Sequence, residues 1–478
     1  MLIDLNASTT SLPKHAEFCI VGSGPAGMTL ALELEQRGRS VLLLEGGGLE
    51  WTPESYELYR GDVVGDYYVG LEYARARQLG GTSGHWGGWS YQLTELAFKE
   101  KSGFEDAQWP IGKKDLDPFL EKARAILDIN APPDDVLLDR EFGIKEFRIA
   151  YSRVKFGQMY RERLTSSQHI TCVTGATLTG LKTNGRNIVD ATVTNFSGKS
   201  ANVTAKYFIL AMGGIENSRM LLWFNHQANG QLVDSRAPLG RYWMEHPAYQ
   251  VGYALVDLKI PKTEYFRPHL LLTFTEEVFQ KLGILECSFV LEGISSTGTK
   301  GLLKDLICVA PRVGEWAASL AGKNIVCGAR FIIGWEQEPL WSNYVKLSET
   351  KRDRFGIPTA ELHWKKSDRD RATMQKAITY FNEFLMAKKH GRVKLADWVF
   401  AKDGYPSSGN DGVSYHHIGG TRMAHVVEKG VVDKNCRVFG QSNLYIAGSS
   451  VFPSGGEANP TLSIVQLSLR LADHLLHT

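Results

Sequence analysis

Two hydrophobic patterns near the start of the chain predict a parallel α/β unit. Phe18 to Val21 form an uninterrupted apolar run, which is typical of a strand buried on both faces of a sheet. Apolar residues then recur at helical spacing as far as Gly38, and a second apolar run covers Val41 to Leu44. The order strand, helix, strand is that of a dinucleotide-type fold.

The same strand pattern returns twice later in the chain. Lys206 to Met212 is an apolar run that leads into glycines and a predicted helix, and Asn443 to Ser450 repeats this arrangement. Leu462 to Leu476 has the spacing of a long amphipathic helix. We therefore expect the C-terminal segments to complete the sheet that begins at the N-terminus.

The middle of the chain has a different period. Residues 249–258 and 285–294 alternate between apolar and polar positions, which predicts an antiparallel sheet with one covered face. Residues 301–323 have an amphipathic pattern, which favours a half-buried helix over a membrane-surface or subunit contact. The predicted fold class is α/β, with a Rossmann-like cofactor domain (1–245 and 405–478) and an inserted substrate domain (246–404) built on a mostly antiparallel sheet with helices.

The glycines after the first strand identify the predicted cofactor site. Gly22, Gly24 and Gly27 follow the strand in G-x-G-x-x-G order. The first allows a tight turn, the second lets backbone approach a pyrophosphate, and the third lets helix pack on strand. Glu45 ends the second strand, 23 positions after Gly22, where an acid binds ribose hydroxyls. This fingerprint alone does not distinguish FAD from NAD.

Composition excludes several function classes. The 478 residues carry 54 Lys and Arg against 52 Asp and Glu, so a nucleic-acid partner is not expected. The six cysteines include no CxxC pair, which speaks against a zinc site, a redox dithiol or any other metal centre. No run of about 18 apolar residues occurs, and the N-terminus does not resemble a signal peptide. A soluble cytoplasmic enzyme without a transmembrane segment is therefore expected, with export alongside a partner protein as the alternative.

Asn459 and Pro460 stand in the order that begins a helix. One interpretation is that Asn459 only caps this helix. The other adds a function, because the free N–H groups and partial positive charge of a helix N-terminus suit a reduced flavin that carries negative charge.

A series of motifs runs from about Ala16 to the end of the sequence. These motifs are the N-terminal fingerprint, LGGTSGHWGG, WPIGKKDLDPF, AMGGIENSRMLL, HHIGGTRM, GVVD, CRVFG, NLYIAGSSVFP and ANPTLSI. Together, and in this order, they resemble the motifs of the glucose-methanol-choline (GMC) family of FAD-dependent oxidoreductases, and they leave out only the variable substrate domain.

The resemblance implies bound FAD and an active site made by two segments. The family's active-site histidine aligns with His416, seven residues before Met423. The family's second active-site residue aligns with Asn459. His417 is the competing assignment, because a shift of one residue would exchange the two histidines. The expected cofactor contacts are Gly22, Gly24, Gly27, Glu45, Gly81, Thr82, His85, Trp86, Ser449, Asn459, Pro460 and Thr461.

The expected reaction explains why a histidine and an asparagine would form the active site. Hydride removal from a C–H bond leaves positive charge on carbon unless the hydroxyl proton also departs, so a base must contact the hydroxyl. A neutral histidine can accept that proton near physiological pH. Asn459 would hold the substrate oxygen without competing for the proton.

The SGHW string ending at Trp86 resembles the STHW string of pyranose oxidase, in which the histidine is joined covalently to the flavin. A covalent bond from His85 to FAD is therefore one hypothesis, and a packed, hydrogen-bonded His85 beside the flavin is the other. For His246, a structural hydrogen-bonded role is favoured over a site role. Four tryptophans could stack on sugar rings, but core packing is the safer interpretation for each: Trp316, Trp335, Trp341 and Trp364.

The leading hypothesis is oxidation of an alcohol on a sugar, glycoside or polyol, since the motifs look closest to the pyranose oxidase and sugar dehydrogenase branch. Oxygen, a quinone or a redox protein would reoxidise the FAD, and the sequence does not choose among them. A lyase on the same fold and a noncatalytic FAD-binding subunit are the alternatives. The substrate, the oligomeric state and any partner subunits stay open.

Overall fold

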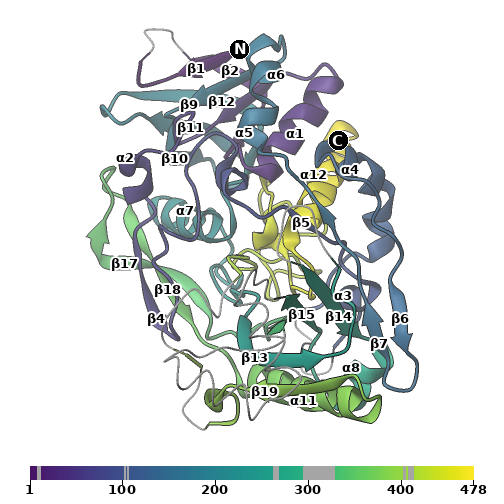
Figure 1. The fold of residues 1–478 in the computed structure, drawn as a ribbon. Helices are drawn as coiled ribbons and strands as arrows, with labels where there is room; N and C mark the ends of the chain where they lie inside the picture. The colour runs from purple at the N-terminus through teal and green to yellow at the C-terminus, as the bar shows by residue number, and fades with distance from the viewer. Residues whose placement is uncertain are drawn as a thin grey trace.

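A computed structural model describes residues 1–7, 12–101, 104, 107–261, 268–293, 329–401, 405–406 and 414–478. These residues form two large sheets, which lie one above the other in Figure 1 with the C-terminal segment between them. The amphipathic segment 301–323 and Trp316 lie outside the described residues.

The upper sheet is the predicted dinucleotide-type sheet. Its strands run in the order β1-β9-β3-β2-β12-β11-β10, and β20 pairs with β12. All pairs from β1 to β12, and the pair with β20, are parallel, whereas β11 and β10 continue it antiparallel. The strands are β1 (Leu2–Asp4), β2 (His15–Val21), β3 (Val41–Leu44), β9 (Ile170–Thr174), β10 (Thr177–Thr183), β11 (Ile188–Thr194), β12 (Ser200–Leu210) and β20 (Leu444–Ile446).

The strand β12 belongs to both parts of this sheet. Its first residues, Ser200 to Val203, pair with β11, whereas Thr204 to Leu210 pair with β2. The last three of these, from Phe208, also pair with β20. The strand predicted to begin at Lys206 therefore begins earlier, at Ser200. The added residues are more polar, and the first of them pair with β11 in the antiparallel part of the sheet.

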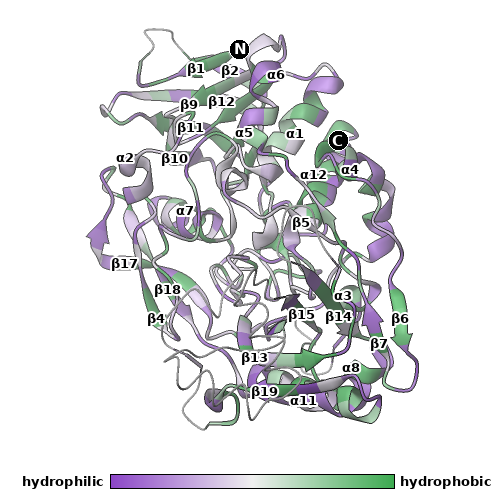
Figure 2. Ribbon diagram, viewed as in Figure 1, coloured by the Kyte–Doolittle hydropathy of each residue, from purple (hydrophilic) through white to green (hydrophobic). Residues whose placement is uncertain are grey.

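Burial explains the strand and helix patterns of this domain. Val41 to Leu44 are all buried, and the helix α1 (Pro25–Gln36) buries most of its length. The C-terminal helix α12 (Pro460–Leu476) packs against α1 and α4 (Leu120–Ile126). In Figure 2, the green of hydrophobic residues runs along the upper strands and α12, where helix and sheet meet.

The lower sheet is the predicted antiparallel sheet. Its order is β19-β13-β16-β15-β14-β7-β6, and every pair is antiparallel. Its core includes Phe289, Phe331 and Phe381, the last of which lies on the covering helix α11 (Asp368–Ala387). The strands are β6 (Val136–Asp139), β7 (Ile144–Glu146), β13 (Ala248–Val256), β14 (His269–Phe274), β15 (Cys287–Gly293), β16 (Ala329–Trp335) and β19 (Gly391–Leu395).

Strands from both sides of residue 246, the predicted start of the substrate domain, build the lower half of the molecule. The strands β6 and β7 precede this residue and join the lower sheet. A small sheet likewise pairs β4 (Gly61–Gly65) in parallel with β18 (Pro358–Trp364), which pairs with β17 (Tyr344–Arg352). Helix α7 (Gly214–Gln227) packs on β17 and β18.

Short elements complete the described fold. They are β5 (Trp89–Ser90), which pairs with β8 (Ala150–Tyr151), and the helices α2 (Pro53–Glu57), α3 (Glu95–Phe98), α5 (Phe156–Met159), α6 (Arg161–Ser166) and α8 (Glu276–Leu282). Among the helices that the structure describes, none combines the length and the apolar character needed to cross a bilayer. The described cysteines, Cys19, Cys172, Cys287 and Cys436, are buried and free.

Candidate active site

The glycine fingerprint forms the turn that its spacing predicts. Gly22 has a φ of +103°, and a Cβ there would lie 2.4 Å from the carbonyl oxygen of Ala211. A Cβ on Gly27 would lie 1.9 Å from the carbonyl oxygen of Gly22, so helix α1 contacts the turn through bare backbone. By contrast, the Cβ position of Gly24 faces open space. Gly24 is also the N-cap of α1 and offers no side-chain cap, which leaves the first N–H groups of the helix for an anion.

Glu45 directly follows β3 beside this turn and is buried. One carboxylate oxygen accepts hydrogen bonds from the N–H and hydroxyl of Ser23, at 3.1 and 2.6 Å. The other accepts from the N–H of Gly47 at 2.8 Å. Glu45 therefore stands beside the glycine turn, where the fingerprint predicts a ribose-binding acid.

The LGGTSGHWGGW segment (79–89) crosses the fingerprint. A Cβ on Gly81 would lie 3.1 Å from Cα of Gly24, so the two backbones are in contact. The Thr82 hydroxyl accepts from the N–H of Ala76 at 3.1 Å, and Trp86 donates to the carbonyl of Val154 at 2.9 Å.

His85 lies in this segment, lines the cavity described below and is exposed. Within the part of the chain that the structure describes, its imidazole makes no hydrogen bond, unlike the packed, hydrogen-bonded histidine of one hypothesis. The covalent bond to FAD stays a hypothesis. Acid precipitation tests it, because yellow colour left in the supernatant would contradict it.

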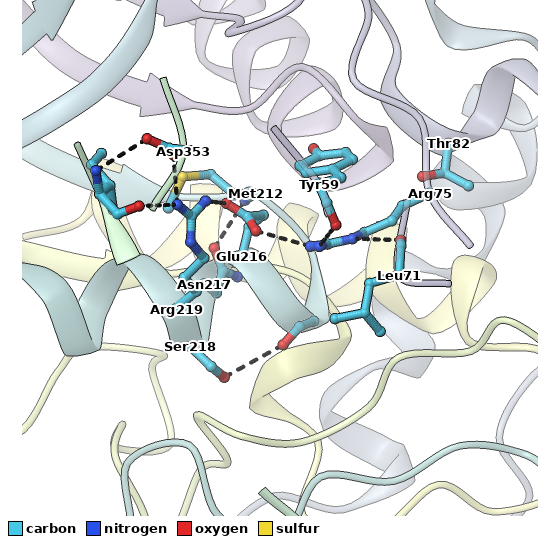
Figure 3. A network of polar contacts seen from close by, with 12 residues as sticks. Tyr59, Leu71, Arg75, Thr82, Met212, Glu216, Asn217, Ser218, Arg219 and Asp353 are labelled. Carbon is cyan, nitrogen blue, oxygen red and sulfur yellow. Dashed lines mark hydrogen bonds and ion pairs between the residues drawn. The ribbon is translucent and has the colours of Figure 1, made fainter. Parts of the chain in front are cut away.

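A buried chain of charges supports the same region from α7 (Figure 3). Glu216 accepts from Arg75 and Arg219, both at 3.0 Å. Arg219 also contacts Asp353 at 2.6 Å. Burial alone would raise the pKa of Glu216, but the two guanidinium groups outweigh it and lower that pKa. This carboxylate is therefore ionised, and each charge in the chain has an opposite partner.

Asn217 ties α7 to the C-terminal segment. Its amide oxygen accepts from the N–H of Met212 at 2.9 Å, and its nitrogen donates to the carbonyl of Ala447 at 3.1 Å and to Ser450 at 3.0 Å. These contacts give Asn217 a structural role, as the ion pairs do for Arg219.

His416 and Asn459 converge although 43 positions separate them. The amide nitrogen of Asn459 lies 3.2 Å from Nε2 of His416. Asn459 occupies the N-cap position of α12 but makes no capping hydrogen bond with its side chain. The interpretation that Asn459 only caps the helix is therefore wrong, because its amide is committed to the histidine.

His246 contacts the other nitrogen of the same ring. The Nδ1 atoms of His246 and His416 lie 2.9 Å apart. With the amide of Asn459 donating to Nε2, the ring proton of His416 resides on Nδ1 and is donated to His246. Nε2 of His416 is then the basic atom. His246 is buried and hydrogen-bonded, as predicted, but its partner is the candidate base itself.

Glu245 fixes the backbone of both histidines. One of its carboxyl oxygens accepts from the N–H of His416 at 2.6 Å and of His246 at 2.9 Å. The other accepts from the hydroxyl of Tyr68 at 2.8 Å, and that hydroxyl also lies 2.9 Å from Nε2 of His417. The second histidine thus points away from Asn459 and into a tyrosine contact, which favours His416 as the base.

Burial sets the protonation states of this cluster. It lowers the pKa of His416 well below its ordinary value, helped by His246 and His417. It likewise lowers the pKa of His246 to about 4 and of His417 to about 3. All three rings are neutral at neutral pH, so His416 is ready to accept a proton. Burial raises the pKa of Glu245 to about 7.

A single cavity of about 990 Å³ joins these parts. It runs from the glycine turn and Glu45, past the 79–89 segment, to His416 and Asn459. Ser449, Pro460 and Thr461 also line it, and the hydroxyl of Ser449 donates to the carbonyl of His417 at 2.6 Å. The structure therefore brings the predicted site residues to one space, except Gly27, which packs against the backbone of Gly22 instead.

The tryptophans divide between this cavity and the core. Trp335 lines the cavity, but its indole N–H donates to Asp370 at 3.2 Å and it is buried. Trp364 is also buried, and Trp341 is 54% exposed away from the cavity. Trp89, the last residue of the 79–89 segment, also lines it.

Sequence reasoning also missed Glu245 and Tyr68. Their contacts span 177 and 349 positions of the chain, and no local spacing signals them. The adjacency of Glu245 to His246 was the one available hint.

Fold, cavity and histidine–asparagine pair together define an oxidoreductase that acts on CH–OH groups. Residues 339–468 match the family described as GMC oxidoreductase, and residues 20–56 match the NAD(P)-binding Rossmann-like domain. Over the larger of these two segments, the chain is similar to the GMC oxidoreductases.

Relatives of established activity are distant. The chain is 21% identical to the fructose dehydrogenase large subunit of Gluconobacter japonicus, over 97% of this chain and 98% of that protein. It is 22% identical to 2-methyl-1,2-propanediol dehydrogenase of Mycolicibacterium austroafricanum, over 98% and 96%. It is also similar to a C-glycoside 3-oxidase of Microbacterium trichothecenolyticum, with 32% identity over 28% of this chain and 24% of that protein.

Solved structures share the fold. Pyridoxine 4-oxidase from Mesorbium loti superposes with a TM-score of 0.63 at 16% identity, over 97% of this chain and 99% of that one. Formate oxidase from Aspergillus oryzae gives a TM-score of 0.58 at 17% identity, over 98% and 99%.

The family implies FAD, and the residues present fit it. The open Cβ position of Gly24 leaves room for a pyrophosphate against the N-terminus of α1. Glu45 lies where a ribose would be bound, and the 79–89 segment and α12 line the remaining cavity up to His416. When bound, FAD would supply the hydride acceptor.

Proposed function

We propose that this protein oxidises an alcohol group on a sugar, glycoside or polyol, with His416 as the base and Asn459 as the residue that holds the reacting oxygen. The observation that carries this proposal is the 3.2 Å approach of the Asn459 amide nitrogen to Nε2 of His416, on the wall of the cofactor cavity.

The two side chains divide the work on one hydroxyl group. Nε2 of His416 accepts the hydroxyl proton, while the amide of Asn459 donates to the oxygen and keeps the carbon in line. When bound, FAD would supply the acceptor for the hydride on the same carbon, and loss of that hydride and the hydroxyl proton would convert the alcohol to a carbonyl compound. Asn459 cannot take the proton, because an amide nitrogen is not basic.

The neighbours of His416 favour this division. The hydrogen bond to His246 keeps the ring proton on Nδ1, so Nε2 stays available to the substrate. Glu245 holds the backbone N–H of His416 at 2.6 Å and thereby fixes the ring's position.

The names of distant relatives support the substrate class. Fructose, a diol and a C-glycoside are named as substrates of proteins similar to this chain. All three are uncharged molecules with several hydroxyl groups. We therefore place the substrate among neutral polyhydroxy compounds, without choosing the carbon oxidised.

Anaerobic mixing tests the proposal. Purified holoenzyme is mixed with sugars, glycosides, polyols and simple alcohols while flavin absorbance is followed. The expected result is bleaching by at least one polyhydroxy compound, which is lost in His416→Ala although FAD stays bound. Unchanged absorbance with every compound would contradict the proposal, and equal bleaching in His416→Ala would contradict the assigned base. An artificial-dye assay beside an oxygen electrode then identifies the class of electron acceptor.

A further inference from the structure

The carboxyl group of Glu457 faces the same cavity as the catalytic pair. Glu457 lies two residues before Asn459, on the segment between β20 and α12, and is partly buried. Its Oε2 lies 3.0 Å from the hydroxyl of Thr273, on strand β14 of the lower sheet. Neither the fingerprint nor the proposed base chemistry uses this group.

Counting protons at Thr273 indicates the charge of this carboxyl group. The Thr273 hydroxyl also lies 2.8 Å from the carbonyl oxygen of Cys287, which can only accept. A hydroxyl has one proton to donate. Both contacts can therefore be hydrogen bonds at once only if Thr273 donates to Cys287 and Glu457 donates to Thr273. In that arrangement Glu457 is a neutral carboxylic acid.

The surroundings favour the neutral form as well. Burial raises the pKa of Glu457 well above its ordinary value, and the nearby carboxylate of Glu286 adds to this effect. The cations in the neighbourhood already have acidic partners. Lys101 contacts Glu286 at 2.7 Å and Glu336 at 2.6 Å, and Lys145 contacts Asp135 at 3.2 Å.

We propose that Glu457 is a substrate-binding residue that, as a neutral acid, accepts a hydrogen bond at Oε1 from a second hydroxyl group of an uncharged polyol. With its proton directed to Thr273, the carboxyl group presents a carbonyl-type oxygen to the cavity. A neighbouring hydroxyl of a polyol, two or three bonds from the reacting one, is a suitable donor. The inference rests on the proposed function and narrows its substrate to neutral compounds with at least two hydroxyl groups.

An ionised Glu457 would make the opposite selection. A carboxylate on a partly buried wall would attract an ammonium group strongly, and an amino alcohol would then be preferred to the matching diol. A neutral Glu457 therefore predicts a preference for the diol, and an ionised Glu457 predicts a preference for the matching amino alcohol.

The test compares matched substrates in the holoenzyme and three variants. The substrate pairs are ethylene glycol and ethanolamine, D-glucose and D-glucosamine, and D-glucitol and D-glucamine, each followed by anaerobic flavin bleaching. The variants are Glu457→Gln, Glu457→Leu and, as a control on an exposed carboxylate outside the cavity, Glu54→Gln.

The neutral acid predicts a specific pattern. Wild type prefers the neutral member of each pair it oxidises, and Glu457→Gln retains this preference with kcat/KM within about 3-fold, since an amide also offers a carbonyl oxygen. Glu457→Leu loses about 10-fold in kcat/KM on the neutral substrate, because one hydrogen bond is removed. A wild-type preference for the amino member that disappears in Glu457→Gln overturns the proposal, and so does an unchanged kcat/KM in Glu457→Leu.

Infrared spectroscopy reads the protonation state without turnover. The neutral acid predicts a carboxylic acid C=O band at pH 7 that is present in wild type and Glu54→Gln and absent in Glu457→Gln. An identical band region in all three proteins contradicts the neutral acid even if substrates are oxidised. Bleaching by no alcohol at all, with the band present, contradicts the proposed function and not the protonation state.

Discussion

Nδ1 of His246 lies 2.9 Å from Nδ1 of His416, so His246 fixes the tautomer of the proposed base. His416 then has a hydrogen-bonding partner on each nitrogen, His246 on one side and Asn459 on the other. The side facing Asn459 is the one at which we propose that the substrate hydroxyl binds. The predictions below begin from this arrangement.

Replacing His416 should slow flavin reduction without removing the flavin. We expect His416→Ala to lower the anaerobic reduction rate about 10²- to 10⁴-fold, the usual contribution of a general base. His417→Gln is the matched control, since His417 contacts Tyr68 instead of Asn459. Stopped-flow absorbance measures both, and a greater loss in His417→Gln would exchange the two assignments.

Removing His246 should move the pH profile. The proximity of His246 lowers the pKa of His416, a smaller cause than burial. In His246→Leu that contribution is absent, so the acidic limb of kcat/KM, where the base becomes protonated, is expected at higher pH than in wild type. A role limited to packing would lower the rate equally at every pH.

Glu245 should make stability depend on pH. Its folded pKa of about 7 exceeds the ordinary value of 4.5, so the folded state holds the proton more tightly. Its stabilising contribution is complete below pH 4.5 and is lost as the pH rises through 7, by about 3 kcal/mol in all. The Tm difference between wild type and Glu245→Gln should therefore fall over this range. The exposed Glu54→Gln variant should show a constant difference, and a constant difference for Glu245→Gln too would contradict the raised pKa.

Valine substitutions at two fingerprint glycines should have different effects on FAD binding and stability. A Cβ on Gly24 meets open space, whereas one on Gly27 meets the carbonyl oxygen of Gly22 at 1.9 Å. We expect Gly24→Val to reduce the FAD-to-protein ratio with little change in the Tm of the apoprotein. Gly27→Val should lower that Tm as well. Full FAD occupancy in Gly24→Val would contradict the predicted pyrophosphate position.

The buried charges of Figure 3 should matter more than exposed ones. Arg219→Met leaves Glu216 and Asp353 without a shared partner, which should cost about 3–5 kcal/mol of unfolding free energy. Arg236 also contacts two carboxylates but at the surface, so Arg236→Met should change little. Thermal or denaturant unfolding measures both, and similar losses would contradict the role of burial.

Local patterns predicted the parts of the fold that local interactions determine. The strand over Val41–Leu44 is observed as predicted, and the helix after Gly24 ends at Gln36, just before Gly38. Periodicity also located β13 and β15 in the antiparallel sheet. It could not show that β6 and β7 join that sheet, because β7 pairs with β14, more than a hundred residues later, and β6 joins only through β7.

The candidate site likewise contains contacts that motifs predict and contacts that only the folded structure shows. Motif order brought His416 and Asn459 together correctly, since each belongs to a segment with its own signature. The contact of Tyr68 with His417 and that of Glu457 with Thr273 arise only from packing between segments far apart in the sequence. Such contacts carry no sequence period, so sequence reasoning could not find them.

The position of β20 and α12 affects how the protein is made. The glycine turn and α1 are translated well before β20, which pairs with β12, and α12, which packs on α1. Because domains normally fold as they emerge, the nascent chain is expected to keep this face of α1 uncovered until β20 and α12 have been synthesised. Flavin loading is therefore expected to be a post-translational event, and loss of even the final helix should leave an insoluble, colourless product.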